Sequence, residues 1–156
     1  MIIFLDNSNI LDVKEGIILQ GCNAQGVMGS GVAKQLRARY PVVYTDYLEH
    51  VQFYNSTEEK LLGTTCVSHV AKALWVYNGI TQEYYGKDGK QYIDYDAITS
   101  VVARAVIDGK AMLKDVHIPY MIGAGLGGGD LTKIKTIIED ISTFYGKNIY
   151  CHIYRQ

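Results

Sequence analysis

Two glycine-rich stretches are the features of this sequence with the clearest potential for chemistry. Residues 20–33 leave an apolar run and lead into a segment with helical spacing, and residues 122–130 do the same further along. Glycine lets a backbone approach a ligand closely, and the first turn of a helix offers unpaired N–H groups and positive dipole. Each stretch therefore suits a phosphate, and two of them facing each other would enclose a diphosphate.

The first stretch does not match the common phosphate-binding motifs. No Gly-Lys-Ser/Thr follows it, as a Walker loop requires, and its glycines lack the GxGxxG spacing. No acidic residue stands about 20 positions further on at a strand end, where dinucleotide-binding folds have one. A plain strand-to-helix turn is therefore the alternative for residues 20–33. At the end of the second stretch, Asp130 suits a helix N-cap, a contact to a ribose hydroxyl, or the orientation of a water.

The elements that must position these stretches alternate between strands and helices. Helical spacing predicts helices over residues 32–40, 94–113 and 134–145, and a further helix over 42–54, where the aromatic residues also suit a strand. Alternating elements favour a mostly parallel sheet covered on both faces, with ligands beyond the carboxyl ends of its strands. Short apolar runs predict strands at residues 2–5, 16–21, 65–70, 74–77, 116–122 and 148–154.

Length and composition narrow the class of protein. We expect one domain over residues 1–156, because 48% hydrophobic and 20% charged residues are typical of a globular chain. The absence of a long apolar run and of a signal peptide predicts a cytoplasmic protein that binds no membrane. A net charge of -1 predicts no intrinsic affinity for nucleic acid. The widely spaced Cys22, Cys66 and Cys151 indicate neither a disulfide framework nor a zinc site.

Several segments together resemble one known family, the macrodomains. Residues 23–33, followed by 37–41, resemble the first ligand loop and helix of that family, and residues 119–130 resemble its second loop. Ser8-Asn9-Ile10-Leu11 is similar to the Gly-Asp/Asn-Ile-Leu stretch after its first strand. The segments occur in the family's order and span nearly the whole chain.

The resemblance implies a three-layer α/β/α fold with a mixed, mostly parallel sheet, and a site for ADP-ribose. Asn9 would receive the adenine amino group, the Ile10 backbone would meet the ring, and Tyr154 would pack against adenine or, alternatively, against the core. Asn23 would contact the distal ribose, unless it only forms a turn. The full set of implied substrate-binding positions is Asn9, Ile10, Gln20, Asn23, Met28, Gly29, Ser30, Gly31, Val32, Gly123, Ala124, Gly125, Leu126, Gly127 and Tyr154.

Within the family, the chain resembles a subgroup that holds ADP-ribose-1''-phosphate phosphatases, terminal ADP-ribose glycohydrolases and antitoxin macrodomains, and it departs from that pattern at three positions. Gln82 stands where the glycohydrolases have a lysine, and Gly127 where some members have an acidic residue. Gln20 stands where some phosphatases have a histidine. Nearby Lys87 and Lys90 are typical of a turn.

The histidines and the segment over residues 79–92 give further expectations about metal binding and about what covers the site. His69 and His117 are expected at strand ends or on the surface, and no His/Cys/Asp cluster has metal-ligand spacing, so neither a metal nor another cofactor is expected. The long connection over residues 79–92, with three tyrosines, would either cover the distal ribose or run exposed with its aromatic rings against the core.

These features favour an ADP-ribose-1''-phosphate phosphatase that works without a metal. Asn23 and Asp130 are the candidate catalytic residues, with Asp130 orienting a water and backbone N–H groups stabilising charge. The expected partners are ADP-ribose or ADP-ribose-1''-phosphate, and ADP-ribosylated macromolecules as a further class. Two alternatives stay open: a reader of ADP-ribose without turnover, and a hydrolase that removes ADP-ribose from protein or nucleic acid.

Overall fold

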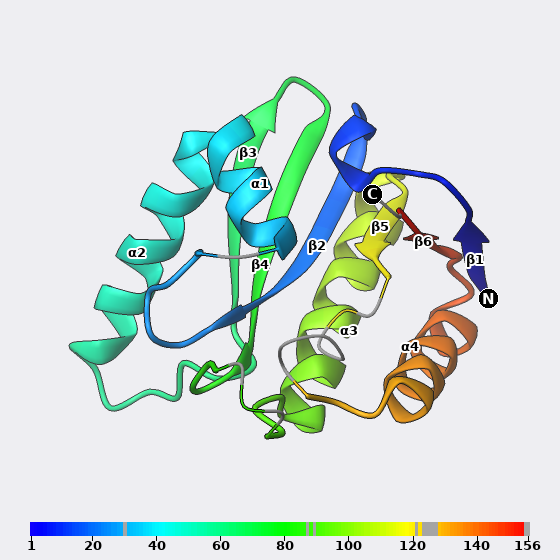
Figure 1. Ribbon diagram of the computed structural model, residues 1–156. Coiled ribbons are helices and arrows are strands. Elements are labelled where there is room, and N and C mark those ends of the chain that lie inside the picture. The colour runs from blue at the N-terminus through cyan, green and yellow to red at the C-terminus, as the bar shows by residue number, and fades with distance from the viewer. Residues whose placement is uncertain (30, 87, 89, 121, 123–127, 155–156) are drawn as a thin grey trace.

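A mixed sheet with strand order β1-β6-β5-β2-β4-β3 forms the centre of the molecule (Figure 1). The computed structural model describes residues 1–29, 31–86, 88, 90–120, 122 and 128–154. All neighbouring strands pair in parallel except β3 with β4, which are antiparallel. The strands are β1 (Ile2–Leu5), β2 (Gly16–Asn23), β3 (Thr65–Ala71), β4 (Leu74–Gln82), β5 (Val116–Pro119) and β6 (Ile149–His152).

Helices cover both faces of this sheet and make three layers, as the sequence predicts. One buried apolar cluster packs α1 (Gly31–Arg39) and α2 (Pro41–Asn55) against β2, β3 and β4. The other packs α3 (Tyr95–Met112) and α4 (Leu131–Tyr145) against the opposite face. Side chains alternate along β2, so Ile17 and Leu19 enter the second cluster and Ile18 the first. A short 3-10 helix, η1 (Ile10–Asp12), follows β1.

The predicted elements are all present, with some shifted boundaries. Residues 42–54 belong to α2, which starts with Pro41 in its first turn, so the strand alternative is wrong. Strands β2 and β4 run on to Asn23 and Gln82 because they pair with each other to that point. Strand β5 ends at Pro119, three residues before the predicted end.

The sheet divides at its centre, between β2 and β5. Their pairing is restricted to Ile17 with Val116 and Ile18 with His117. Beyond that point β2 follows β4, whereas β5 follows β6. The chain leaves β2 toward α1 on one face and leaves β5 toward α4 on the other (Figure 1). This reversal is a topological switch point, the place where open α/β sheets bind ligands.

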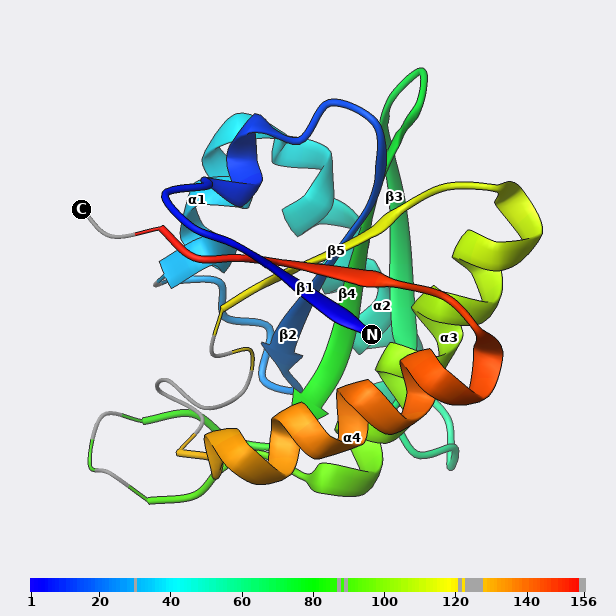
Figure 2. The ribbon, with the colours of Figure 1, turned by 90° about the vertical axis from the view of Figure 1, so that its right-hand side faces the viewer.

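Strands β1 and β6 lie side by side at one edge of the sheet (Figure 2). Their register pairs Ile2 with Ile149 and Leu5 with His152. The segment after β1 crosses back over the sheet, and Ser8 N donates to the Ile153 carbonyl at 2.9 Å. In the part of the chain that the structure describes, no helix combines the length and apolarity that a membrane crossing needs.

Candidate functional site

The first glycine-rich stretch forms a turn that the Asn23 side chain organises. Its Oδ1 accepts a hydrogen bond from Gln25 N at 2.9 Å, and its Nδ2 donates to the Val27 carbonyl at 2.9 Å. The structure therefore shows the turn-forming role for Asn23. A contact to the distal ribose stays a prediction, and it would use the second N–H of the same amide, because Oδ1 also accepts from the Tyr47 hydroxyl.

Tyr47, on α2, forms hydrogen bonds to this turn. This contact is not among the positions predicted from the sequence. Its hydroxyl donates to the Asn23 carbonyl at 2.6 Å and accepts from Gly26 N at 3.1 Å. The ring is completely buried, and burial raises the pKa of the phenol well above its usual range. The sequence offered a signal, because Tyr47 shares the buried helix face of Val43 and Val51.

Replacing Tyr47 with phenylalanine should loosen the turn without removing the ring from the core. The change leaves Gly26 N–H and the Asn23 carbonyl without this partner, which costs about 1–2 kcal/mol. We expect roughly tenfold weaker binding of ADP-ribose in calorimetric titration and a small fall in the free energy of unfolding. Unchanged affinity would mean that the turn does not depend on the Tyr47 hydroxyl.

The end of β4 lies against the first stretch. Asn23 pairs with Gln82 in the sheet, Ala24 N donates to the Gln82 carbonyl, and Gln25 Nε2 donates to the Glu83 carbonyl. Position 82, where the resemblance implies a lysine in glycohydrolases, is thus adjacent to Asn23. The Gln82 amide itself donates to the Tyr84 carbonyl at 2.7 Å.

The connection after β4 carries exposed aromatic rings. Tyr84 and Tyr85 are 62% and 54% exposed, so the expectation that the connection's rings are pinned to the core is wrong for these two. Tyr92 donates its hydroxyl to the Asp88 carboxylate. The other alternative, that this connection covers the distal ribose, stays a prediction, and the two exposed rings are compatible with it.

The second stretch is described only at its two ends. The predicted ligand positions Gly123, Ala124, Gly125, Leu126 and Gly127 lie outside the described residues, as does Ser30 of the first stretch. Gly128 has a φ of +69°, and a Cβ atom there would overlap the Lys90 carbonyl oxygen. The backbones of Gly128 and Lys90 are therefore packed directly together.

Asp130 caps α4. Its Oδ1 accepts from Thr132 N at 2.9 Å and from Lys133 N at 3.2 Å, and its own N–H donates to the Tyr95 hydroxyl. This is the N-cap role expected from its position, and the carboxylate is exposed. Whether the same group orients a water is a separate prediction.

The remaining predicted positions divide between surface and core. Met28 is buried, Gly29 and Gly31 are exposed, and Val32 lies on the first turn of α1. Gln20 is 1% exposed and faces the core beneath α2, where its Nε2 donates to Asn78 Oδ1 at 2.7 Å.

The predicted adenine end lies on the segments that follow β1 and β6. Asn9 Oδ1 accepts from Leu11 N at 3.0 Å and caps η1, and Ile10 is buried. Tyr154 is 51% exposed, so its ring is available to a ligand rather than packed in the core. The two segments touch through Ser8 N and the Ile153 carbonyl.

Two histidines join these segments to the sheet. Ser8 Oγ and His152 Nδ1 are 2.7 Å apart, and His152 Nε2 and His117 Nδ1 are 2.8 Å apart. His117 is the second residue of β5, near the strand end as expected, and its ring is half-buried rather than on the surface. Burial and then the neighbouring His152 lower the pKa of His117 to about 4, and burial lowers the pKa of His152.

This pair should make the fold sensitive to acid. A folded pKa below the ordinary 6.5 means that the unfolded chain binds more protons, so stability is complete above pH 6.5 and falls as the pH drops toward about 4. After allowance for the exposed part of the ring, the loss is about 1–2 kcal/mol. In urea unfolding over this range, His117→Gln should show a flatter pH dependence than the wild-type protein. Equal slopes would contradict the assignment.

Thiol chemistry and metal ligation have no support in the described part of the chain. Cys22, Cys66 and Cys151 are free and buried, and burial raises the pKa of each thiol, to about 11 for Cys66 and Cys151. Such thiols are poor nucleophiles at neutral pH. Among the described residues, no group of three or more His, Cys, Asp or Glu side chains could hold a metal ion.

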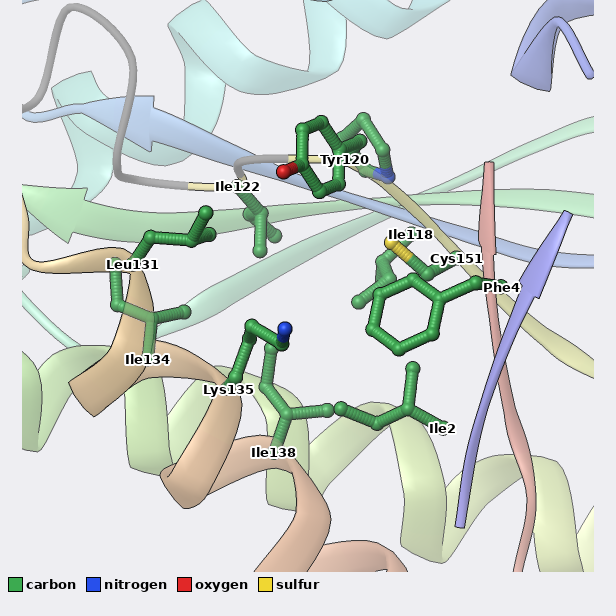
Figure 3. A pocket seen from close by; sticks show the side chains of 11 residues that line it. Ile2, Phe4, Ile118, Tyr120, Ile122, Leu131, Ile134, Lys135, Ile138 and Cys151 are labelled. Carbon is green, nitrogen blue, oxygen red and sulfur yellow. The ribbon is translucent and has the colours of Figure 1, made fainter. Parts of the chain in front are cut away.

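A small, shallow pocket lies between α4 and the edge of the sheet (Figure 3). Phe4 of β1 and Lys135 of α4 face each other there, with the ammonium 5.1 Å from the ring centre. Its other walls are mostly aliphatic, so it offers few polar groups that could take part in catalysis. The lining residues are Ile2, Phe4, Ile118, Pro119, Tyr120, Ile122, Leu131, Ile134, Lys135, Ile138 and Cys151.

Comparison with known sequences gives one partial similarity. No model of a known protein family matches the chain. Over 51 residues, or 33% of this chain, it is 39% identical to the ADP-ribose 1''-phosphate phosphatase of Scheffersomyces stipitis. The match spans 30% of the length of that phosphatase.

Comparison with solved structures identifies the fold. A protein of unknown function from Bacteroides thetaiotaomicron is similar over 97% of both chains, with a TM-score of 0.82 and 26% identity. A macrodomain protein from Streptomyces coelicolor gives a TM-score of 0.82 at 22% identity, over 99% of this chain and 100% of the other. DarTG of Thermosipho africanus, solved in complex with ADP-ribose, gives 0.68 at 19% identity, over 88% of this chain and 38% of the other. The chain has the macrodomain fold.

Proposed function

We propose that this protein binds ADP-ribose at the switch point and hydrolyses ADP-ribose-1''-phosphate to ADP-ribose and phosphate. One observation carries the proposal: the two glycine-rich stretches leave adjacent strands, β2 and β5, where the sheet divides. The partial similarity to a phosphatase of that substrate and the structural similarity to a protein solved with ADP-ribose support it.

In this proposal the ligand lies across the carboxyl ends of the strands. The first turn of α1, which begins at Gly31 and Val32, supplies N–H groups and the helix dipole to the diphosphate, and Gly29 precedes it. The second stretch supplies further backbone donors around the distal ribose. Asn9, Ile10 and Tyr154 hold adenine. Backbone donors and one stacked ring correspond to binding in the micromolar range, about -8 kcal/mol.

Hydrolysis would proceed by attack of a water oxygen on the 1''-phosphorus. The bond between phosphorus and the 1'' oxygen breaks, and the ADP-ribose 1''-hydroxyl takes up a proton. Asp130 would orient the water through the carboxylate oxygen that does not cap α4, and Asn23 would fix the ribose. Backbone N–H groups would stabilise the charge on the phosphoryl oxygens. Positioning alone gives slow turnover, so we expect a weak enzyme.

A reader of ADP-ribose without turnover is the second candidate. The hydrogen bonds within the protein favour it, because Asn23 and one oxygen of Asp130 already serve the turn and the helix cap. A hydrolase of ADP-ribosylated macromolecules is the third candidate. Gln82, which pairs with Asn23, stands where the resemblance implies a lysine in the glycohydrolases, and this argues against hydrolysis that depends on that lysine. No gain of de-ADP-ribosylation in Gln82→Lys would argue against position 82 as a catalytic position.

Phosphorus NMR with ADP-ribose-1''-phosphate distinguishes these readings. The phosphatase predicts inorganic phosphate at a rate that scales with protein concentration. The matched variant is Asp130→Asn, which retains a side chain that caps helices but loses the charge, and it should slow turnover without unfolding α4. Shifted diphosphate resonances without free phosphate would establish a reader, and no spectral change would overturn ADP-ribose binding altogether.

A further inference from the structure

The Ser8–His152–His117 chain reaches from the middle of the sheet to the predicted adenine end. His117 lies on β5, His152 at the end of β6, and Ser8 directly before Asn9. The serine hydroxyl can donate or accept, so both hydrogen bonds form in either direction when the two imidazoles are neutral. The burial that lowers both pKa values keeps the imidazoles neutral at physiological pH.

Ser8 is held on both its backbone and its side chain. Its N–H donates to the Ile153 carbonyl, and its hydroxyl bonds to His152. The Tyr120 N–H in turn donates to the His152 carbonyl, which joins the end of β6 to the residue directly after β5. The residue next to Asn9 is therefore fixed from two directions.

Asn9 itself has a defined amide orientation. Its Oδ1 accepts from Leu11 N at 3.0 Å, which leaves one lone pair on the same oxygen for a further donor. A primary amino group on a purine is such a donor, whereas a purine carbonyl in the same place would meet this oxygen with repulsion. A shift of Asn9 by a fraction of an ångström would weaken that distinction.

We propose that Ser8, His152 and His117 are positioning residues that fix Asn9 and thereby set the preference of the site for a 6-amino purine. The inference rests on the proposed ADP-ribose site. In the sequence motif that residues 8–11 resemble, the first position is glycine, so the Ser8 hydroxyl is an anchor which the motif does not require. The histidines act through Ser8 and do not touch the ligand.

The experiment compares ADP-ribose with its inosine analogue, in which a carbonyl replaces the 6-amino group. Dissociation constants are measured by calorimetry for the full chain, Ser8→Gly, Ser8→Thr and His152→Gln. The wild-type protein should prefer ADP-ribose by about tenfold or more. Ser8→Gly should reduce this preference to about twofold, and Ser8→Thr, which retains the hydroxyl, should keep it. His152→Gln should behave like Ser8→Gly.

The outcomes separate this inference from the proposed function. If the wild-type protein binds neither ligand, the ADP-ribose site is wrong. If it binds both and Ser8→Gly weakens both equally, the chain only stabilises the fold and the inference fails. A preference lost in Ser8→Gly and retained in Ser8→Thr supports it, because a general loss of stability would not distinguish the two purines.

Discussion

Replacing Asn23 with alanine should weaken the binding of ADP-ribose by about 30-fold or more. The side chain closes the first glycine-rich turn through Gln25 N and the Val27 carbonyl, and its Oδ1 also accepts from the Tyr47 hydroxyl at 2.9 Å. Loss of several such hydrogen bonds destabilises the closed conformation of the turn by about 2 kcal/mol or more. The diphosphate then meets a turn that is seldom in the competent conformation.

The global fold should tolerate this change, because the turn lies at the surface beyond the end of β2. Calorimetric titration gives the affinity, and thermal unfolding gives the stability. Asn55→Ala, at the exposed last residue of α2, is the matched control and should bind normally. Wild-type affinity in Asn23→Ala would place the diphosphate away from this turn.

Replacing Gly128 with alanine should disturb both stability and binding. The φ of +69° strains any residue with a Cβ by about 1–2 kcal/mol, and the new atom would overlap the Lys90 carbonyl oxygen. Relief requires one backbone to move away from the other, which brings the total to about 2–4 kcal/mol. We expect at least tenfold weaker ADP-ribose binding, because the second stretch moves with Gly128.

Gly146→Ala is the control for backbone strain alone. Gly146 ends α4 with a φ of +64°, and no atom lies within 4 Å of the position of its Cβ. Its substitution should lower the melting temperature by about 2–4 °C and leave binding unchanged. Equal effects of the two substitutions on binding would show that contact between Gly128 and Lys90 does not matter for the site.

The sequence predicted the fold because its signals are local and periodic. The stripe Ile134, Ile138 and Ile141 identifies α4, and the alternation of strands and helices gives the layers. The ends of the strands depend on their pairing with other strands, and hydrophobic periodicity within one segment does not predict this pairing. Strand β4 extends to Gln82, which pairs with Asn23 on one side and bridges to Ile93, and β5 ends at Pro119.

Local sequence motifs predicted the turn at Asn23 and the helix cap at Asp130, whereas contacts between residues far apart in the sequence were missed. Asn23 and Asp130 stand at the ends of strand-to-helix stretches, so a turn and an N-cap could be expected there, whereas the cap that Asn9 forms on η1 was not predicted. Tyr47 supports the first turn from a helix 24 residues away, and His152 reaches Ser8 across 144 residues. Such contacts follow from the packing of α2 and β6, which no single segment encodes.

The pairing of β1 with β6 has a consequence for synthesis on the ribosome. In the register of the two strands, Ile149 follows its partner Ile2 by 147 positions along the chain (149 − 2), so β6 is made long after β1. The first strand must therefore wait without its partner while the intervening helices and strands are made, since contacts of such large sequence separation form slowly. Asn9 and Tyr154 flank this pair, so under the proposed function a nascent chain that stops short of β6 would lack the proposed adenine end and would not be stabilised early by nucleotide.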